Sequence, residues 1–285
     1  MLGKLMKYEW RGYRFPMMIM LIILAGTTLL TCGIILTINP EYDEVMTGYS
    51  VAALMLSIFL YYFGIIGCAL GTMLIICIRF YKTCYTDQGY LTHTLPVSSK
   101  QLLNAKTIMA VLTYLLLLLS IAVSIGIIIM VTINHIISLS PEDADLIRRE
   151  LAKGFSEFTS EFSEEFGISL GLYLTYLIVY FTIACVANII TIMGCVSLGQ
   201  LYAKHRIIGA IAAYFVVNFV MQIIGYISTI PMYAKMINAD KYGSDITPFG
   251  LMSPSMNITL VITILLAVGM YFVNLHMMTK KLNLE

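Results

Sequence analysis

Charged residues are scarce in this chain of 285 residues, and long parts of it contain none. Lys, Arg, Asp and Glu make up 12% of the sequence, against roughly one quarter in ordinary soluble domains, and the mean hydropathy is +0.87. Six stretches, together 195 residues, have no charged side chain. They are residues 15–40, 45–78, 107–141, 166–203, 207–234 and 246–279. A soluble core cannot absorb six such runs, which excludes a soluble globular protein.

Signatures of catalysis and of cofactor binding are also missing. The chain has no Gly-x4-Gly-Lys-Ser/Thr phosphate loop and no Gly-x-Ser-x-Gly nucleophile elbow. No charged residue lies in the middle of a charge-free stretch, where a proton relay or a coupling-ion site would need one. The four histidines are scattered, and no two of the six cysteines form a Cys-x-x-Cys pair. We therefore expect no enzymatic activity, no catalytic residue, no bound cofactor or metal, and no nucleic-acid partner.

The charge-free stretches have the composition and length of transmembrane helices. About 20 apolar residues in a helix cross the hydrocarbon core of a bilayer, and each stretch is longer than that, with Leu, Ile, Val, Met and Phe predominating. The sequence predicts an all-α integral membrane protein, with residues 1–285 forming one transmembrane domain of six helices. An even number of spans places both termini on one side.

The charges outside these stretches divide unevenly between the two sides. The side that carries the termini has twelve basic and three acidic residues, net +9, and the other side has five basic and thirteen acidic residues, net −8. By the positive-inside rule, both termini are cytoplasmic. All six cysteines then fall within spans or on the cytoplasmic side, so no disulfide framework is expected.

Polar and small residues within the spans mark faces where helices pack or where a substrate passes. Gly67 and Gly71 form a small-xxx-small pair that allows helices to approach closely. Further polar residues share faces of the fourth and fifth spans because they recur at helical spacing. They are Asn188, Thr191 and Ser197, and Asn218 and Gln222. Buried amides in lipid need partners, so these residues either lock spans together or line a polar path.

The segment before the first span, residues 1–16, interleaves apolar and basic side chains. Lys4, Lys7, Arg11 and Arg14 alternate with bulky apolar residues, and Trp10 is suited to anchor the segment at the membrane interface. One interpretation is an amphipathic elbow helix that lies among anionic lipid headgroups. The other is a basic flank that only orients the first span.

The first cytoplasmic loop, residues 79–106, carries the most specific signal in the sequence. It is expected to form two short amphipathic pieces separated at Pro96, with Ser98 or Ser99 capping a helix that begins near Lys100. Tyr90, Leu91 and Leu95 form an apolar cluster that no other part of the chain obviously covers. Such a cluster in the cytosol indicates a docked partner. The alternative is a solvated turn between two spans.

Two predicted external segments differ in character. Residues 141–166 predict an amphipathic helix with an apolar stripe of Ile147, Leu151, Phe155, Phe158, Phe162 and Phe166 and an acidic opposite face. This helix covers the external mouth, lies on the membrane or pairs with a sister subunit, either as a solvated scaffold or in contact with cargo. Residues 231–256 are expected to form a short re-entrant or interfacial structure, or an ordinary loop.

The chain resembles the membrane subunits of bacterial ABC type-2 export permeases. Two elements carry the resemblance: the opening Met1-Leu2-Gly3-Lys4-Leu5-Met6-Lys7-Tyr8-Glu9-Trp10, and the loop motif Asp/Glu-x-Gly-Tyr-Leu-x-x-Thr-Leu-Pro-Val-Ser after the second span. In that family the first cytoplasmic loop is a coupling helix seated in a groove of a separate ATP-binding subunit. The resemblance implies a docking element made of Asp87, Gly89, Tyr90, Leu91, Thr94, Leu95 and Pro96.

The resemblance also implies the partners and the location. ATP and Mg²⁺ would be held by cytosolic ATP-binding subunits, and a second permease subunit, identical or paralogous, would complete the path across a bacterial cell membrane. Relatives export drugs, antimicrobial peptides or lipids, and the aromatic and acidic exterior leans toward amphipathic peptides or drugs. Two other functions stay open: a membrane scaffold or sensor that does not transport, and a secondary carrier, although no intramembrane ionisable residue or clear inverted repeat supports a carrier.

Overall fold

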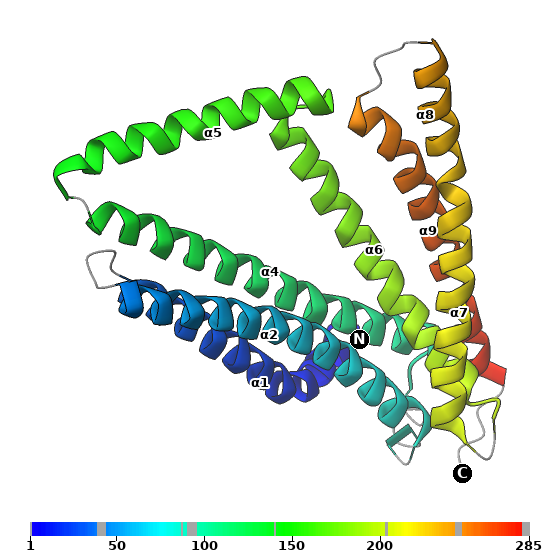
Figure 1. Cartoon of the computed structure of the whole chain (residues 1–285). Coiled ribbons are helices and arrows are strands. Elements are labelled where there is room, and N and C mark those ends of the chain that lie inside the picture. The colour runs from blue at the N-terminus through cyan, green and yellow to red at the C-terminus, as the bar shows by residue number, and fades with distance from the viewer. Residues whose placement is uncertain are drawn as a thin grey trace. The chain divides into compact units, whose positions relative to one another are not determined.

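The computed structural model describes residues 2–38, 44–86, 88–89, 96–139, 141–202, 205–242 and 247–280, which are helical apart from short connections and include no strand (Figure 1). The helices are α1 (Leu2–Thr37), α2 (Glu44–Tyr85), α4 (Ser99–Leu139), the short 3₁₀ helix η1 (Pro141–Asp143), α5 (Ala144–Phe166), α6 (Leu170–Gly199), α7 (Arg206–Ser228), α8 (Ile230–Tyr242) and α9 (Pro248–Lys280).

Six segments of this structure are long and apolar enough to cross a membrane. They lie in α1, α2, α4, α6, α7 continuing into α8, and α9. The prediction of an all-α, multi-pass membrane protein with six spanning helices is therefore confirmed. The side of the membrane on which the termini lie stays a prediction from the charge distribution.

The chain folds as two compact units. The first, here the α1 unit, consists of residues 3–76 and 108–153, and the second, here the α6–α9 unit, consists of residues 1–2, 77–107 and 154–285. Helices α2 and α4 each contribute to both, because the division falls after Ile76 in α2 and after Thr107 in α4. The ends of α2 and α4 that flank the first predicted cytoplasmic loop therefore belong with α6, α7 and α9.

The α1 unit has a small apolar core between α1, α2 and α4. Met17, Leu24, Cys68 and Leu117 are buried in it. Hydrogen bonds between elements of this unit include Tyr61 Oη with Ser124 Oγ (2.6 Å), His135 Nε2 with the carbonyl oxygen of Ile38 (2.8 Å), Cys68 Sγ to the carbonyl oxygen of Met20 (3.4 Å) and Thr31 Oγ1 to the carbonyl oxygen of Ser57 (3.4 Å). All six cysteines of the chain are free thiols.

The glycines of α2 do not pack as the sequence predicts. A Cβ on Gly71 would lie 2.6 Å from Met20 Cε and one on Gly64 would lie 3.1 Å from Thr27 Cγ2, whereas a Cβ on Gly67 would meet nothing within 4 Å. The small face against α1 is thus Gly64 with Gly71, two helical turns apart, and the predicted pair of Gly67 with Gly71 is wrong. A spacing of seven residues keeps both glycines on one side of the helix as well as a spacing of four does.

In the α6–α9 unit, α6 packs against both α7 and α9. Gly199 and Gly209 form the tight turn between α6 and α7, where a Cβ on Gly199 would clash with the backbone of Ala210. Farther along α6, a Cβ on Gly194 would lie 2.8 Å from Met270 Cβ of α9. These close approaches bury ten residues of α6, most of them in its last three turns.

Two segments outside the charge-free stretches are helical. Residues 2–16 are continuous with the first span in α1, and Pro16 lies inside that helix; the place of this segment among lipid headgroups stays a prediction. Residues 230–242 form α8, which follows α7 after the single residue Thr229, and the last helix begins at Pro248. The alternative of an ordinary loop over 231–256 is therefore wrong, and a re-entrant or interfacial position stays a prediction. Pro231 and Pro248 fall in the first turn of a helix, where proline is tolerated.

Candidate functional site

The ends of α2 and α4 hold the first predicted cytoplasmic loop. Helix α2 ends at Tyr85, and Thr86 Oγ1 donates to the carbonyl oxygen of Lys82 (2.7 Å) while the Gly89 N–H donates to the carbonyl oxygen of Thr86 (2.6 Å). On the other side α4 begins at Ser99, and the Gln101 N–H donates to Ser98 Oγ (3.3 Å). The predicted capping of this helix is confirmed, with Ser98 as the capping residue.

Two of the seven predicted docking residues can be located. Gly89 is buried in a short helical segment, and Pro96 is exposed at a bend before α4. The other five lie outside the described residues. They are Asp87, Tyr90, Leu91, Thr94 and Leu95.

A buried polar chain connects the end of α2 to α6 and α9. Tyr85 Oη lies 2.7 Å from Ser197 Oγ, and Ser197 Oγ in turn contacts the Asn274 amide. With the Asn274 nitrogen facing Ser197, it also donates to the carbonyl oxygen of Met193 (3.0 Å), and its Oδ1 accepts from the Gly194 N–H (3.1 Å). One amide from α9 thus bonds three groups of α6.

Two more hydrogen bonds in the same unit connect α9 to α4 and α4 to α2, so that four helices are joined in a ring. Tyr271 of α9 donates to Asn104 Oδ1 of α4 (2.6 Å), and Lys106 Nζ of α4 donates to Thr83 Oγ1 of α2 (2.6 Å). We call the residues Thr83, Tyr85, Asn104, Lys106, Ser197, Tyr271 and Asn274 the polar ring. It joins α2 to α6, α6 to α9, α9 to α4 and α4 back to α2.

The polar ring lies in a water-poor environment. The exposed fractions of Lys106, Asn274 and Ser197 are 3%, 1% and 0%. Hydrogen bonds are stronger at low dielectric, and an unpaired polar group there costs about 1–3 kcal/mol. The ring therefore fixes the helix ends that hold the loop relative to α6 and α9, and it resists rearrangements that separate its partners.

The five residues predicted as a path or as packing contacts fall into two groups. Thr191 and Ser197 are buried, Thr191 bonding the carbonyl oxygen of Ala187 on its own helix and Ser197 joining the polar ring. Asn188, Asn218 and Gln222 are exposed, and Asn218 Nδ2 donates only to the carbonyl oxygen of Tyr214 on its own helix (2.8 Å). The structure of the single chain does not bring these three amides together with the two buried hydroxyls.

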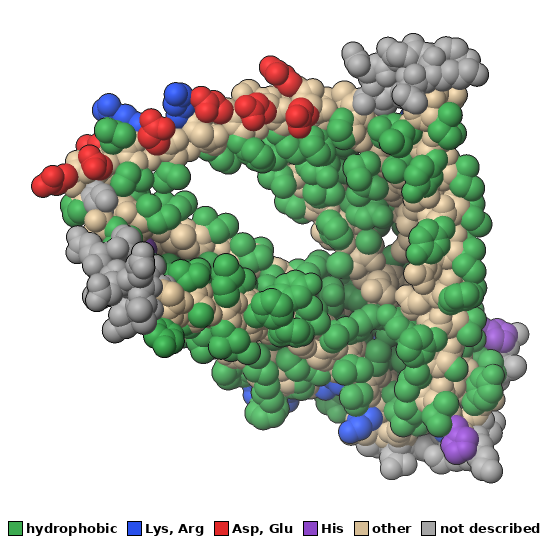
Figure 2. All heavy atoms as spheres, viewed as in Figure 1, with side chains coloured by type: hydrophobic (Ala, Val, Ile, Leu, Met, Phe, Trp, Pro, Cys, Tyr) green, Lys and Arg blue, Asp and Glu red, His purple; other side chains and the backbone are tan. Residues whose placement is uncertain are grey.

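The predicted amphipathic helix at residues 141–166 is present as η1 and α5. Figure 2 shows its acidic side chains along one face and apolar side chains along the opposite face. Leu151, Phe155 and Phe158 of the stripe are exposed. Phe162 and Phe166, at the end of the helix, are partly covered.

An aromatic cluster surrounds the turn between α5 and α6. Phe162 and Phe166 stack at 4.3 Å between ring centroids, Tyr173 of α6 contacts both, and Phe249 at the start of α9 contacts Tyr173. Gly167 allows the turn because its φ is +71°, and a Cβ there would lie 2.5 Å from Thr247 Cγ2. The end of the stripe is therefore part of the packing of the α6–α9 unit.

Sequence reasoning missed most of the polar ring. Ser197 was singled out, but Thr83, Tyr85, Asn104, Tyr271 and Asn274 were not. Asn274 carried a usable signal, since an amide near the end of a charge-free stretch needs a partner. The sequence does not indicate which residues are its partners, because they are distant along the chain. Ser197 lies 77 residues before Asn274, and Tyr85 lies 112 residues before Ser197.

Within the described residues no group of three or more His, Cys, Asp or Glu side chains is arranged to hold a metal ion. The site can therefore be described by its hydrogen bonds and apolar contacts. No protein-family model, curated protein or solved structure matches the chain.

Proposed function

We propose that this chain is the membrane-spanning permease subunit of an ATP-driven exporter. In this proposal residues 79–106 dock a separate cytosolic ATP-binding subunit, which carries ATP and Mg²⁺. The observation that supports it best is the polar ring, because it ties α2 to α6 through a buried hydrogen bond and α4 to α9 through a partly buried one. A push on the loop would thus be transmitted to the spans.

The mechanism follows from this connection. Closure of two ATP-binding subunits displaces the loop, and the displacement reaches α6 through Tyr85 and Ser197 and reaches α9 through Asn274. If α6 moves as a rigid body, a shift at its cytoplasmic end also moves its other end. Tyr173 and Tyr176 at that end contact Phe166 and Phe249 of the aromatic cluster. The spans then alternate between inward-open and outward-open arrangements.

A second permease subunit completes the proposed path. Asn188, Asn218 and Gln222 are exposed in the single chain, and carboxamides facing lipid are costly without partners. A second copy or a paralogous chain would supply those partners, and the amides would line the path between the two. The acidic face of α5 favours drugs or peptides that are amphipathic and cationic as cargo.

Co-purification tests the docking proposal. The chain is isolated from its native membranes in mild detergent, and bound proteins are identified by mass spectrometry and assayed for ATPase activity. The loop variant carries Tyr90→Ala with Leu95→Asp. The control carries Tyr233→Ala with Leu146→Asp, the same exchanges at two exposed residues of α8 and α5 on the predicted external side. We expect an ATPase subunit with the native chain and the control, and its loss from the loop variant. Equal recovery from both variants, or no ATPase with the native chain, would refute the proposal.

A further inference from the structure

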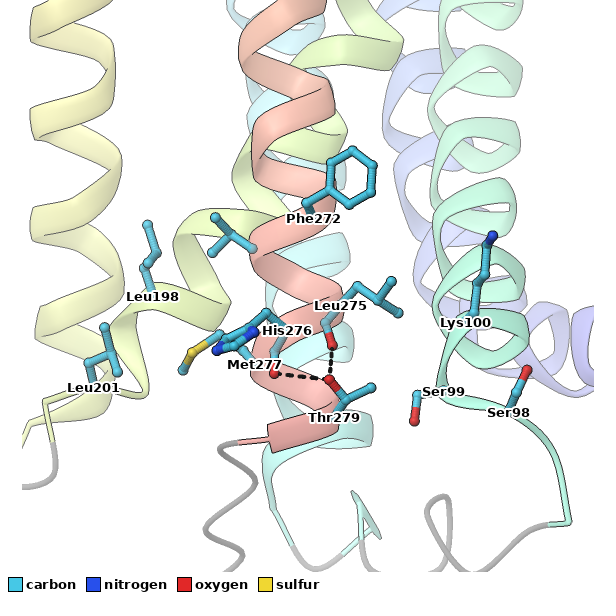
Figure 3. A pocket seen from close by; sticks show the side chains of 11 residues that line it. Ser98, Ser99, Lys100, Leu198, Leu201, Phe272, Leu275, His276, Met277 and Thr279 are labelled. Carbon is cyan, nitrogen blue, oxygen red and sulfur yellow. Dashed lines mark hydrogen bonds between the residues drawn. The ribbon is translucent and has the colours of Figure 1, made fainter.

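A groove of about 830 Å³ lies in the α6–α9 unit, away from the polar ring's hydrogen bonds (Figure 3). Its lining comes from the start of α4 (residues 98–100), from Leu198 and Leu201 at the end of α6, and from the last turns of α9 between residues 272 and 279. Figure 3 shows Phe272, Leu275 and Thr279 on the side of α9 that faces the start of α4. The groove is therefore open to occupants that approach between helix ends.

The lining combines apolar walls with two basic groups. Leucine, valine, methionine and phenylalanine side chains form most of it, while Lys100 and His276 supply the basic groups and Ser98, Ser99 and Thr279 supply hydroxyls. No hydrogen bond or ion pair joins the side chain of Lys100 to another described residue. The groove thus offers a cation for which the described residues supply no counter-ion, beside an apolar surface.

The depth of the groove in the membrane follows from the sequence and the helices. Helix α9 ends at Lys280, directly after the last charge-free stretch, so Thr279 lies at the predicted cytoplasmic boundary. Lys100 precedes the charge-free stretch that begins at residue 107 by seven residues, which is about 10 Å of helix. The headgroup layer on each side of a bilayer is about 5–8 Å thick. The Lys100 backbone therefore lies at the outer edge of the headgroup layer. Its side chain extends along α4 toward the span (Figure 3), which brings the ammonium to phosphate level, and Phe272 lies toward the acyl chains.

We infer that this groove binds an anionic phospholipid of the cytoplasmic leaflet. Lys100 contacts the phosphodiester, and an acyl chain lies against Phe272 and Leu275, which Figure 3 shows on the side of α9 that faces Lys100. Charge complementarity selects the occupant, because a lysine at the surface of an anionic membrane contributes about 1 kcal/mol of attraction, whereas the choline ammonium of a zwitterionic lipid offsets its own phosphate. The inference depends on the six-span topology with cytoplasmic termini. Residues 98–100 also belong to the loop proposed to dock the ATP-binding subunit, so the test uses the chain without that subunit, and its outcome is separate from that of the docking experiment.

Native mass spectrometry of the detergent-purified full chain tests the inference. The protein is titrated with phosphatidylglycerol and, separately, with phosphatidylcholine of the same acyl chains, and the fraction carrying one lipid is measured. Lys100→Glu reverses the charge, Lys100→Gln only removes it, and Leu275→Trp fills the apolar wall. Matched controls are Lys82→Glu, on an exposed lysine of α2, and Leu265→Trp, on an exposed leucine of α9 outside the groove.

The native chain and both controls should retain phosphatidylglycerol in preference to phosphatidylcholine. Retention should be about thirtyfold weaker for Lys100→Glu and about fivefold weaker for Lys100→Gln, and severalfold weaker for Leu275→Trp. Unchanged gel-filtration profiles show that each variant is folded. Retention within twofold of native for all three groove variants would overturn the inference, as would equal binding of the two lipids.

A competition with oleate separates a membrane lipid from a free anionic amphiphile. If the groove is built for a phospholipid, equimolar oleate leaves the phosphatidylglycerol complex in place. Displacement of the phospholipid by equimolar oleate, with the same dependence on Lys100, would assign the groove to a single-chain carboxylate and contradict the inference.

Discussion

Two asparagines in neighbouring helices of one unit have opposite surroundings. Asn274 of α9 is buried and bonds Ser197, the carbonyl oxygen of Met193 and the N–H of Gly194. Asn218 of α7 is exposed and bonds only its own helix. The same side chain therefore joins two helices in one position and bonds only its own helix in the other. The asparagine at the polar ring is thus bonded within one chain to a second helix, whereas the asparagine of α7 is not.

The largest expected effect is the difference in the free energy of unfolding between replacing Asn274 and replacing Asn218 by leucine. Asn274→Leu removes the amide and its three bonds to α6, although Ser197 keeps its bond to Tyr85. We expect a loss of about 2–4 kcal/mol in the free energy of unfolding. Asn218→Leu should change it by less than about 0.5 kcal/mol in the monomer. Unfolding in mixed micelles with increasing SDS measures both. Equal losses for the two variants would contradict the distinction.

Glycines on the same helices extend the comparison from hydrogen bonding to packing. Gly194→Ala would bring a Cβ to 2.8 Å from Met270 Cβ, and we expect a destabilisation of about 1–3 kcal/mol from overpacking. Gly225→Ala on α7 meets nothing within 4 Å and should stabilise the helix by about 0.5–1 kcal/mol. The same unfolding assay measures both variants. A stabilising Gly194→Ala would show that α6 and α9 are packed less closely.

Removal of a single hydroxyl should have a smaller effect. Tyr85→Phe deletes the bond to Ser197 but leaves Ser197 paired with Asn274, so a loss of about 1 kcal/mol is expected. Tyr226→Phe, on an exposed tyrosine of α7, serves as the control and should be neutral. In a double-mutant cycle, Tyr85→Phe should lose most of its effect when Ser197 is already alanine. Full additivity would mean that the two hydroxyls do not interact.

Replacing the exposed amides of α7 should instead weaken the association between two chains. Asn218→Leu with Gln222→Leu removes two exposed amides, and interhelical hydrogen bonds in membranes contribute about 0.6 kcal/mol each. We expect the dissociation constant of the permease pair to rise severalfold, measured by fluorescence energy transfer between labelled chains in liposomes. The double variant Thr175→Val with Thr182→Val on α6, which removes two hydroxyls that bond only their own helix, is the control. Unchanged association of the leucine variant would exclude these amides from the interface.

The elements that local patterns specify could be predicted from the sequence. Six apolar stretches gave six spanning helices, the regular stripe gave α5, and Ser98 caps α4 as expected. Local patterns misled at Pro231 and Pro248, because proline both interrupts helices and begins them. Pairings between distant helices could not be predicted: nothing near Tyr85 indicates Ser197, and nothing near Asn104 indicates Tyr271. The docking residues of the loop stay predictions.

The central claim, that the polar ring carries movement of the loop to the spans, can be tested at the far end of α6. Leu174→Cys places an exposed thiol there, and its labelling by a membrane-impermeant maleimide is measured in the permease–ATPase complex with and without ATP and vanadate. We predict that trapping changes the labelling rate several-fold in the native background and leaves it unchanged when Asn274→Leu breaks the ring, although the ATPase stays bound. An equal change in both backgrounds would contradict the claim.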